Sequence, residues 1–456
     1  MNKFNIITFI GVVLIGLIGG CREDEVLDVD LANYDSYTPG PVDDWIRTNL
    51  TDPYNIDVVY RYQRSMHEQD RNISPPDEGR VVPQMSIVLE GFIKLYEKVG
   101  GSTFIKTYTP KQFALFGSGN YRPDGVVVAG TADAGRRITL YGLNGLNETN
   151  PNSVLGNLGV VHHEFVHILN QMRLIPPSFE QVSRGDYYAN WTSAADNPES
   201  LSRSLGFISR YARQNVGEDF AETMSYLIVS GQLAFDSYAA ASGEVGGPRL
   251  KRKEAIVRDY LQQNFNIDLT ELQYEFAKIM SGQYNSTAFT VRHAINQRLI
   301  GSITVDNKAG YINEYGLSSS FDTQVYQEVS ARFQASGYAF NRFTLLFQSP
   351  TRFTLRVSFG TYNGDYDFDI VDQGDGTYRF ALSETQGTGT TYNNGAIDWV
   401  YNGSAPIINY LQDHAFEGNW YPKGVEPTSE TYLRYAGFDV VDDTDNYFYG
   451  AMTSIY

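Results

Sequence analysis

Five consecutive residues, His163-Glu164-Phe165-Val166-His167, decide which fold the sequence predicts. On a helix, residues four apart lie one turn above each other, so the imidazoles of His163 and His167 can reach one metal ion. Glu164 is offset from that row, and its carboxylate suits the general base that deprotonates a zinc-bound water. With 6 histidines among 456 residues, a chance match to this pattern is rare. We therefore predict a zinc site with His163 and His167 as metal ligands and Glu164 as the catalytic base.

The residues on both sides of this motif predict a buried helix over 153–172, which ends before Pro176-Pro177. His162 is rotated about 100° from His163 and is expected not to bind metal. The alternative is a helix that carries two surface histidines, and the apolar pattern favours the buried helix. Apolar side chains recur at helical spacing at Leu155, Leu158, Val161, Val166 and Leu169.

A tetrahedral catalytic zinc site needs a third protein ligand and leaves the fourth position for water. The other histidines are isolated in the sequence or lie in its β-rich part: His67, His293 and His414. A carboxylate is therefore expected. The helix predicted over 215–230 offers two of them, Glu218 and Glu222, one turn apart.

Glu218 also has an explanation that needs no metal. Asn215 could be the N-cap of this helix and Glu218 its partner at the third helical position, in a capping box. Position alone favours neither interpretation. We expect Glu218 to bind zinc, with Glu222 as the next candidate, because a helix with two histidine ligands would otherwise lack a third. Asp219 is rotated away by one residue and is expected to face solvent.

The segment 211–222 resembles the gluzincin metallopeptidases, and especially their lethal-factor-type branch. That branch carries a tyrosine seven residues before its ligand glutamate and reads similarly through Phe220-Ala221-Glu222. The resemblance implies that Glu218 is the third zinc ligand and that Glu222 hydrogen-bonds a ligand histidine. It also implies that the hydroxyl of Tyr211 stabilises the oxyanion, although Tyr211 could be one more packed tyrosine among 33.

The N-terminus predicts a lipoprotein. Residues 1–20 carry one charged side chain, Lys3, and an apolar run too short to span a membrane, as in a signal peptide. The small residues before Cys21, the single cysteine, resemble the lipobox of bacterial lipoproteins, which implies a lipid anchor on Cys21. The acidic run Arg22-Glu23-Asp24-Glu25 is similar to the surface-export signal of Bacteroidetes lipoproteins. It could equally be a solvated tether.

The remaining sequence predicts an α+β protein, a zincin-like metallopeptidase domain followed by a β-rich C-terminal domain. An acidic tether is expected over 21–52, because Tyr37-Thr38-Pro39-Gly40-Pro41 cannot continue a helix. The zinc metallohydrolase domain is expected over 53–300, and a β-rich accessory domain of unknown function over 301–456. In the first domain we predict helices at 81–99 and 251–280 and strands at 56–62, 103–108, 125–129 and 137–141. In the second, period-two alternation predicts strands at 343–347, 353–357, 366–370 and 378–382, with one helix at 407–414.

The lipobox, the acidic tether and the two site helices together resemble the substrate import-associated zinc metallohydrolase lipoproteins of Bacteroidetes, a gluzincin-like family. The resemblance is strongest over 55–300. It implies hydrolysis of a peptide bond with one Zn²⁺ per chain, and a peptide or glycopeptide as substrate. It further implies a lipoprotein exposed on the outer membrane beside a nutrient-uptake complex. The segment 137–141 could be the edge strand along which an extended substrate pairs.

The rival interpretation is a surface lipoprotein that binds nutrient polymers on a zincin scaffold without catalysis. The intact Glu164 argues against it, because zinc binding alone does not need that carboxylate. Nucleic acid is not an expected partner, since 53 acidic and 35 basic residues give a net charge of -18 and no basic cluster interrupts them.

Overall fold

The computed structural model describes residues 37–133, 135–315, 319–422, 424–443 and 445–456. The predicted signal peptide, Cys21 and the acidic run after it lie outside the described residues. The chain divides into two compact units, Met1–Asp44 and Trp45–Tyr456, and the second holds the sheets, the barrel and the candidate site. Of the helices in the described part of the chain, none combines the length and apolar character needed to cross a bilayer.

Helical structure begins earlier than predicted, inside the segment assigned to the tether. Helix α2 (Pro41–Ile46) is followed by a π-helical stretch, η2 (Arg47–Thr51), and by α3 (Asp52–Tyr54). The segment 37–41 was expected not to continue a helix, and Pro41 is the first residue of one, where its missing N–H costs nothing and its fixed φ favours the helix. Residues 41–54 are therefore helical, and the tether over 21–52 stays a prediction.

A four-stranded sheet has the order β1-β2-β6-β5. Strands β1 (Asp57–Val59), β2 (Gln112–Leu115) and β6 (Arg137–Leu140) run parallel, and β5 (Gly130–Asp133) pairs antiparallel with β6. The expectation that 137–141 is an edge strand is wrong, because β6 lies between β2 and β5. The edge strand next to β6 is β5, and β1 is the edge strand on the other side of the sheet. The sequence of β5, Gly-Thr-Ala-Asp, lacks the apolar alternation that identifies a strand.

The strand predicted at 103–108 is also wrong, because these residues belong to helix α5 (Leu95–Tyr108). Gly101, with φ at +81°, kinks the helix and breaks its sequence pattern. Phe104 is buried and stacks on Tyr96, with ring centroids 5.8 Å apart. Packing thus overrides the strand propensity of the sequence that follows the kink.

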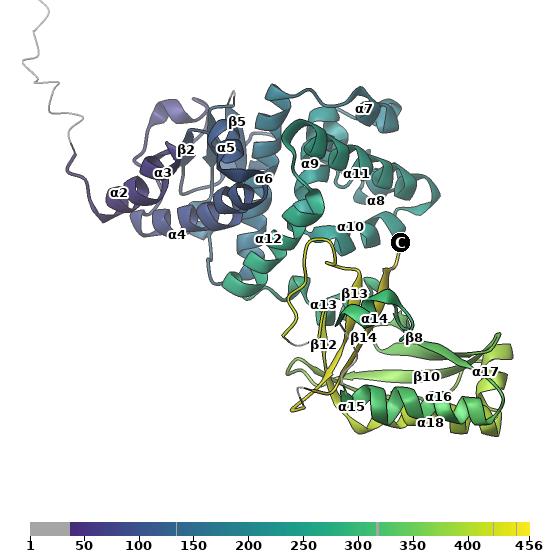
Figure 1. The fold of residues 1–456 in the computed structure, drawn as a ribbon. Helices are drawn as coiled ribbons and strands as arrows, with labels where there is room; N and C mark the ends of the chain where they lie inside the picture. Colours follow the sequence, from purple (N-terminus) through teal and green to yellow (C-terminus); the bar gives the residue numbers. More distant parts are fainter. Residues whose placement is uncertain (1–36, 134, 316–318, 423, 444) are drawn as a thin grey trace, which may run out of the picture. The chain divides into compact units, whose positions relative to one another are not determined.

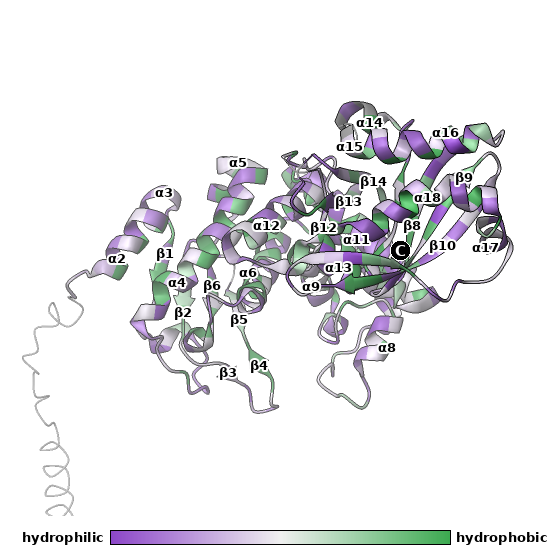
Figure 2. Ribbon diagram, turned by 90° about the horizontal axis from the view of Figure 1, so that it is seen from below, coloured by the Kyte–Doolittle hydropathy of each residue, from purple (hydrophilic) through white to green (hydrophobic). Residues whose placement is uncertain are grey.

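Helix α6 (Pro151–Met172) carries the His163–His167 motif and packs along α9 (Val216–Val229), beside which it lies in Figure 1. Both confirm helices predicted from the sequence. A short hairpin joins β3 (Asn120–Tyr121) to β4 (Val127–Val128), and β4 is coloured as hydrophobic in Figure 2. The other helices of this part are α4 (Glu78–Val88), η4 (Leu89–Lys94), α7 (Pro177–Ser183), α8 (Glu199–Ser204), α10 (Gly231–Ala240), α11 (Gly243–Phe265), α12 (Leu269–Tyr284) and α13 (Val291–Asn296), with 3-10 turns η3 (Arg64–Met66), η5 (Leu143–Gly145), η6 (Arg184–Asp186), η7 (Ala212–Gln214) and η8 (Thr287–Phe289).

Within the described residues, eight strands close an antiparallel barrel in the order β10-β11-β12-β13-β14-β7-β8-β9. The α+β class, with a β-rich C-terminal part, is therefore confirmed, whereas closure of the barrel was not predicted. Helices α16 (Gln327–Ala335) and α18 (Asp398–Asp413) lie side by side in Figure 1 and share one apolar cluster with the strands. The strands are β7 (Ile300–Val305), β8 (Phe340–Ser349), β9 (Arg352–Phe359), β10 (Tyr362–Asp372), β11 (Thr377–Leu382), β12 (Ala415–Asn419), β13 (Tyr435–Val440) and β14 (Tyr447–Ser454), and the shorter helices are α14 (Gly310–Tyr315), α15 (Ser319–Phe321), η9 (Asp322–Tyr326) and α17 (Thr390–Gly395).

Candidate metal centre

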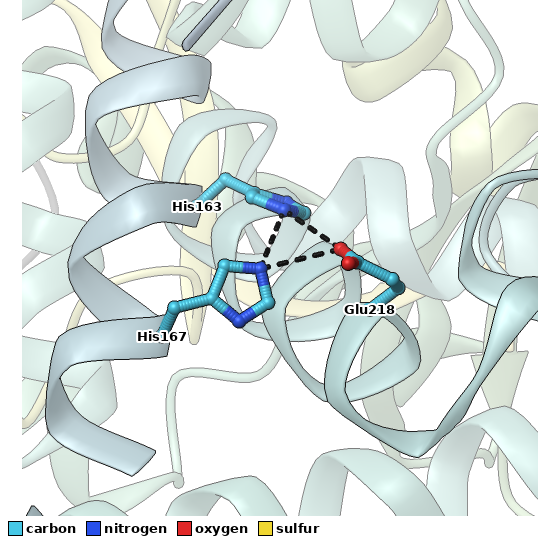
Figure 3. A group of neighbouring side chains, drawn as sticks. All are labelled: His163, His167 and Glu218. Carbon is cyan, nitrogen blue, oxygen red and sulfur yellow. Dashed lines mark hydrogen bonds and ion pairs between the residues drawn. The ribbon is translucent and has the colours of Figure 1, made fainter. Parts of the chain in front are cut away.

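Helix α6 presents both histidines of the motif to one point. Asn150 is the N-cap of the helix, and its side chain accepts a hydrogen bond from the backbone N–H of Asn152. Pro151 is the first helical residue. The Nε2 atoms of His163 and His167 lie 3.1 Å apart (Figure 3). These two nitrogen atoms are close enough to bind one cation between them.

Glu218 comes to the same point from the first turn of α9. Its Oε2 lies 3.2 Å from Nε2 of His163 and 3.2 Å from Nε2 of His167 (Figure 3). Asn215 does cap α9, because its side chain accepts from the N–H groups of Gly217 and Glu218. The Glu218 carboxylate contacts the histidines instead of completing a capping box, so the cap by Asn215 leaves Glu218 available as a metal ligand.

The three donor atoms fit a tetrahedral zinc ion. With ligands about 2.0–2.1 Å from the metal, ligand atoms of a tetrahedral site lie about 3.3 Å apart. The three observed separations are 3.1, 3.2 and 3.2 Å. Two imidazoles and one carboxylate are also ligands that zinc prefers.

The charges around these atoms favour a cation. Burial alone lowers the pKa of His163, but its contacts with Glu218 and Glu222 and the nearby Glu164 raise this pKa to about 10. Burial opposes ionisation of Glu218, yet hydrogen bonds to the two histidines hold its pKa well below the usual range. The carboxylates of Glu164, Glu218 and Glu222 thus surround the two imidazoles. Their negative charge favours a bound cation or, without one, a proton on His163.

Glu222 lies one turn after Glu218 on α9 and contacts the far side of a histidine. Its Oε1 is 2.9 Å from Nδ1 of His163, off the ideal hydrogen-bond direction. Its Oε2 accepts a hydrogen bond of 2.7 Å from the hydroxyl of Ser209. Glu222 therefore orients the His163 ring, and Ser209, which no sequence pattern singled out, orients Glu222.

Tyr211 lies over the site from the loop before η7. Its ring stacks on His163, with centroids 5.7 Å apart and planes at 21°, and its other neighbour is Trp191 at 4.8 Å. Burial, followed by the charge and proximity of Glu218, raises the pKa of Tyr211 well above its ordinary value. The hydroxyl therefore keeps its proton and can donate it in a hydrogen bond. Sequence reasoning missed Trp191, whose backbone carbonyl is held by Arg210.

Glu164 is buried, 8% exposed, and lies beside the edge strand β5. Burial raises the pKa of Glu164, and this rise is partly offset by His163, by His167 and by the nearby backbone of Ala132 in β5. Gly130 permits this close approach, because a Cβ there would lie 2.5 Å from the side chain of Val160 on α6. A carboxylate with a raised pKa suits a general base that works near neutral pH.

A cleft of about 620 Å³ opens onto these groups. His163, Glu164, Tyr211 and Glu222 line it together with Trp191 and the β3–β4 hairpin. A molecule in this cleft can contact Glu164, Tyr211 and His163 at once.

Asp219 is not where the sequence placed it. The expectation that it faces solvent is wrong, because its side chain is fully buried and lies 2.7 Å from Nζ of Lys253 on α11. The hydroxyl of Tyr187 donates to the same carboxylate. Helix α11 covers this side of α9, so a side chain that points away from the metal position is buried between the two helices.

The remaining histidines lie away from the three donor atoms. His162 is buried between Tyr96 and the carbonyl of Gly91, and burial lowers its pKa to about 3. His67 contacts the hydroxyl of Tyr62, and His414 the carbonyl of Tyr410. His293 lies on α13.

The chain resembles other proteins over the part that holds this site. A solved structure described as a "putative zinc-binding metallo-peptidase from Bacteroides caccae ATCC 43185" is 28% identical, with a TM-score of 0.46, and the match covers 54% of this chain and 94% of that one. No curated protein matches. A sequence profile described as "putative zinc-binding metallo-peptidase" matches residues 35–270, more than half of the 456 residues. The chain therefore belongs to this family of zinc-binding metallopeptidases.

Proposed function

We propose that the protein is a zinc-dependent metallopeptidase that hydrolyses peptide bonds, with His163, His167 and Glu218 as the ligands of one Zn²⁺ per chain. The observation that carries the proposal is the triangle of donor atoms, 3.1–3.2 Å on each side, beside a buried carboxylate. Zinc held there would polarise a carbonyl and lower the pKa of water.

Glu164 moves the proton in this proposal. It takes a proton from the attacking water and later gives it to the leaving amine. Its burial favours both steps, because a carboxylate with a raised pKa is a better base and its protonated form persists longer at neutral pH.

Tyr211 stacks on the ring of His163, Glu222 contacts its Nδ1, and both support the reaction. The protonated hydroxyl of Tyr211 donates to the oxygen that becomes negative as the tetrahedral centre forms. Glu222 fixes the orientation of the His163 ring through Nδ1.

The extended substrate pairs with the free edge of β5. This replaces the role first assigned to 137–141, since β6 is covered on both sides. The Glu164 side chain lies 3.3 Å from the Cβ position of Gly130 at the start of β5, so a peptide on this edge passes the base. We take the pairing as antiparallel, the commoner arrangement and the one β5 makes with β6.

We further propose that the protein is anchored through Cys21 to the outer membrane, exposed at the cell surface beside a nutrient-uptake complex. Peptides or glycopeptides from outside the cell would then be its substrates. The support is the lipobox and acidic run in the sequence.

The first prediction tests the base. Glu164→Gln is expected to keep one zinc per chain and to abolish hydrolysis of a peptide mixture, because it removes the proton acceptor and none of the ligands. Zinc content by elemental analysis and cleavage by mass spectrometry are measured on the same sample.

The wild-type protein reconstituted with zinc is the control. Wild-type turnover in Glu164→Gln would exclude this mechanism, and loss of zinc would make Glu164 a ligand. A wild-type protein that binds peptides without cleaving them would favour the non-catalytic binding lipoprotein.

A further inference from the structure

A second cavity, of about 380 Å³, adjoins the cleft of the candidate active site. The two hollows share four lining residues, Gly156 on α6, Tyr226 and Val229 on α9, and Ser230 after it. We propose that this second cavity, which we call the distal cavity, holds the residues of a peptide substrate that follow the scissile bond, and that it selects apolar or aromatic side chains. The inference rests on the proposed peptidase function and adds the barrel to the substrate-binding surface.

The path from the metal position to the distal cavity follows one face of α6. Gly156, Gly159 and His163 lie three and four residues apart and therefore share that face. Glycine in a helix interior destabilises the helix relative to alanine. No protein atom lies within 4 Å of where a Cβ would be at Gly156 or Gly159, so packing within the described residues does not require glycine at either position. A peptide that lies along this face would require glycine at both positions, because larger side chains would occupy its path.

The length of the path sets the number of residues. From His163 to Gly156 is seven residues of helix, about 10 Å. An extended peptide covers that distance with about three residues. The third and fourth residues after the bond would therefore reach the distal cavity.

The direction follows from the edge strand. Gly130 at the start of β5 lies against Val160, and Gly135 beyond its end lies near Ile168, so β5 and α6 run the same way. A peptide antiparallel to β5 runs the other way, from the metal position toward Gly156. The carboxyl side of the substrate therefore enters the distal cavity.

The wall of the distal cavity is mostly apolar and comes from both parts of the protein. Leu155 and Phe289 line it from the first part, and Trp420, Tyr432 and Leu433 from the connection between β12 and β13. The indole N–H of Trp420 donates to the carbonyl of Phe289 at 2.7 Å, so its polar group is satisfied within the protein. The hydroxyl of Tyr274 on α12 donates to the carbonyl of Pro427 and holds this connection in place. Polar side chains, among them Gln232, Thr290 and His293, also line the cavity, but the aromatic wall built by this connection suits apolar or aromatic side chains.

The test begins with a peptide that the zinc-loaded wild-type protein cleaves, found by mass spectrometry in a protein digest. That peptide is synthesised in two series, shortened one residue at a time from its carboxyl end or from its amino end. For wild type, we expect kcat/KM to fall by roughly tenfold or more when the third and fourth residues after the bond are removed.

Gly156→Leu fills the path, and Gly282→Leu is its matched control. Gly282 is also a glycine inside a helix, α12, with no protein atom within 4 Å of its Cβ position, but it lies outside both hollows. Gly156→Leu should lower kcat/KM most for the longest carboxyl-side peptides and flatten the length dependence, whereas Gly282→Leu should leave the profile of wild type. Both should melt at or above the wild-type temperature, because leucine favours helix over glycine.

Peptide affinity is a second readout, measured by calorimetry in zinc-loaded Glu164→Gln with and without Gly156→Leu. The same length dependence is expected in Kd. If Gly156→Leu does not fold, Gly156→Ala and Trp420→Ala give the same comparison from the two sides of the path.

Two failures are distinguishable. If the wild-type protein cleaves no more than Glu164→Gln, the proposed function is wrong and the inference falls with it. If wild type cleaves but Gly156→Leu leaves the length profile unchanged, lowers all lengths equally, or acts only on the amino-side series, the inference alone is overturned.

Discussion

Asn215 and Glu218 stand three residues apart at the start of α9 and have separate roles. Asn215 accepts hydrogen bonds from two backbone N–H groups of the first turn, and Glu218 contacts both histidines. Removing a cap changes the stability of the helix with or without metal, whereas removing a ligand changes metal affinity. The two interpretations that the sequence left open can therefore be measured one residue at a time.

Glu218→Gln is expected to weaken zinc affinity by a large factor, because the amide lacks the charge that attracts the cation. The stability of the zinc-free protein should change little. Asn215→Ala should do the reverse, with a stability loss of about 0.5–2 kcal/mol. Competition with a chromogenic chelator gives the affinity, and thermal melts in chelator give the stability. If Glu222→Gln strips the metal and Glu218→Gln does not, the assignment of the third ligand is wrong.

Tyr211→Phe is expected to keep zinc and peptide affinity while lowering kcat, since one hydrogen-bond donor to the oxyanion is worth roughly 2.7–4 kcal/mol. The ring that stacks on His163 remains, so the site keeps its shape. Steady-state kinetics on one cleaved peptide separate kcat from KM. An unchanged kcat would assign Tyr211 to packing alone.

The residues that the sequence could predict are those tied together by local spacing. His163, Glu164 and His167 follow from helical geometry alone, and the structure brings Glu218 and Glu222 to the same point. Ser209 and Trp191 lie in loops, where position depends on the tertiary fold and no periodicity marks the side chain. The burial of Asp219 was not predicted either, because it depends on α11, which covers this side of α9 only in the tertiary fold.

At the scale of elements, the buried pair Asp219–Lys253 joins α9 to α11. Nζ of Lys253 lies 2.7 Å from Asp219 Oδ2, donates to the carbonyl of Gly206, and sits 4.1 Å from the ring centroid of Phe207. Both charged side chains are fully buried. Because Asp219 neighbours Glu218, this pair also holds the first turn of α9 in register with the histidines.

Lys253→Met is expected to destabilise the protein by about 3–5 kcal/mol, because it leaves Asp219 as an uncompensated buried charge. Lys98→Met is the control. It removes the pair that the exposed Lys98 makes with the partly buried Glu275, 3.7 Å apart, and should cost less than about 1 kcal/mol. Chemical denaturation measures both, and the double variant Lys253→Met, Asp219→Asn should recover part of the loss. Equal effects of the two single lysine variants would show that the buried pair has no special role.

Elements were predictable where their own side chains carry the pattern. Helices α6 and α9 have apolar stripes, and β8 to β11 alternate, so each was expected close to its observed bounds. The edge strand β5 is short and weakly apolar, and its pairing with β6 is a tertiary contact that no local pattern contains.

At the scale of the whole molecule, barrel closure was beyond local sequence patterns. It depends on which strands become neighbours, and β7 reaches β14 across almost the entire C-terminal part. The limits 53–300 and 301–456 stay predictions. The distal cavity, lined from both parts, would make the barrel a partner in substrate binding and no longer a separate accessory.

The proposed attachment of the whole protein to a membrane depends on Cys21, which lies outside the described residues. Cys21→Ala is expected to release the protein from the membrane fraction, because the proposed lipid on Cys21 would be the anchor. Fractionation of cells grown with labelled palmitate measures both lipidation and location. Protease added to intact cells then distinguishes the faces, since a surface-exposed lipoprotein is digested and a periplasmic one is protected. A Cys21→Ala protein that carries no label but stays in the membrane fraction would show that another attachment exists.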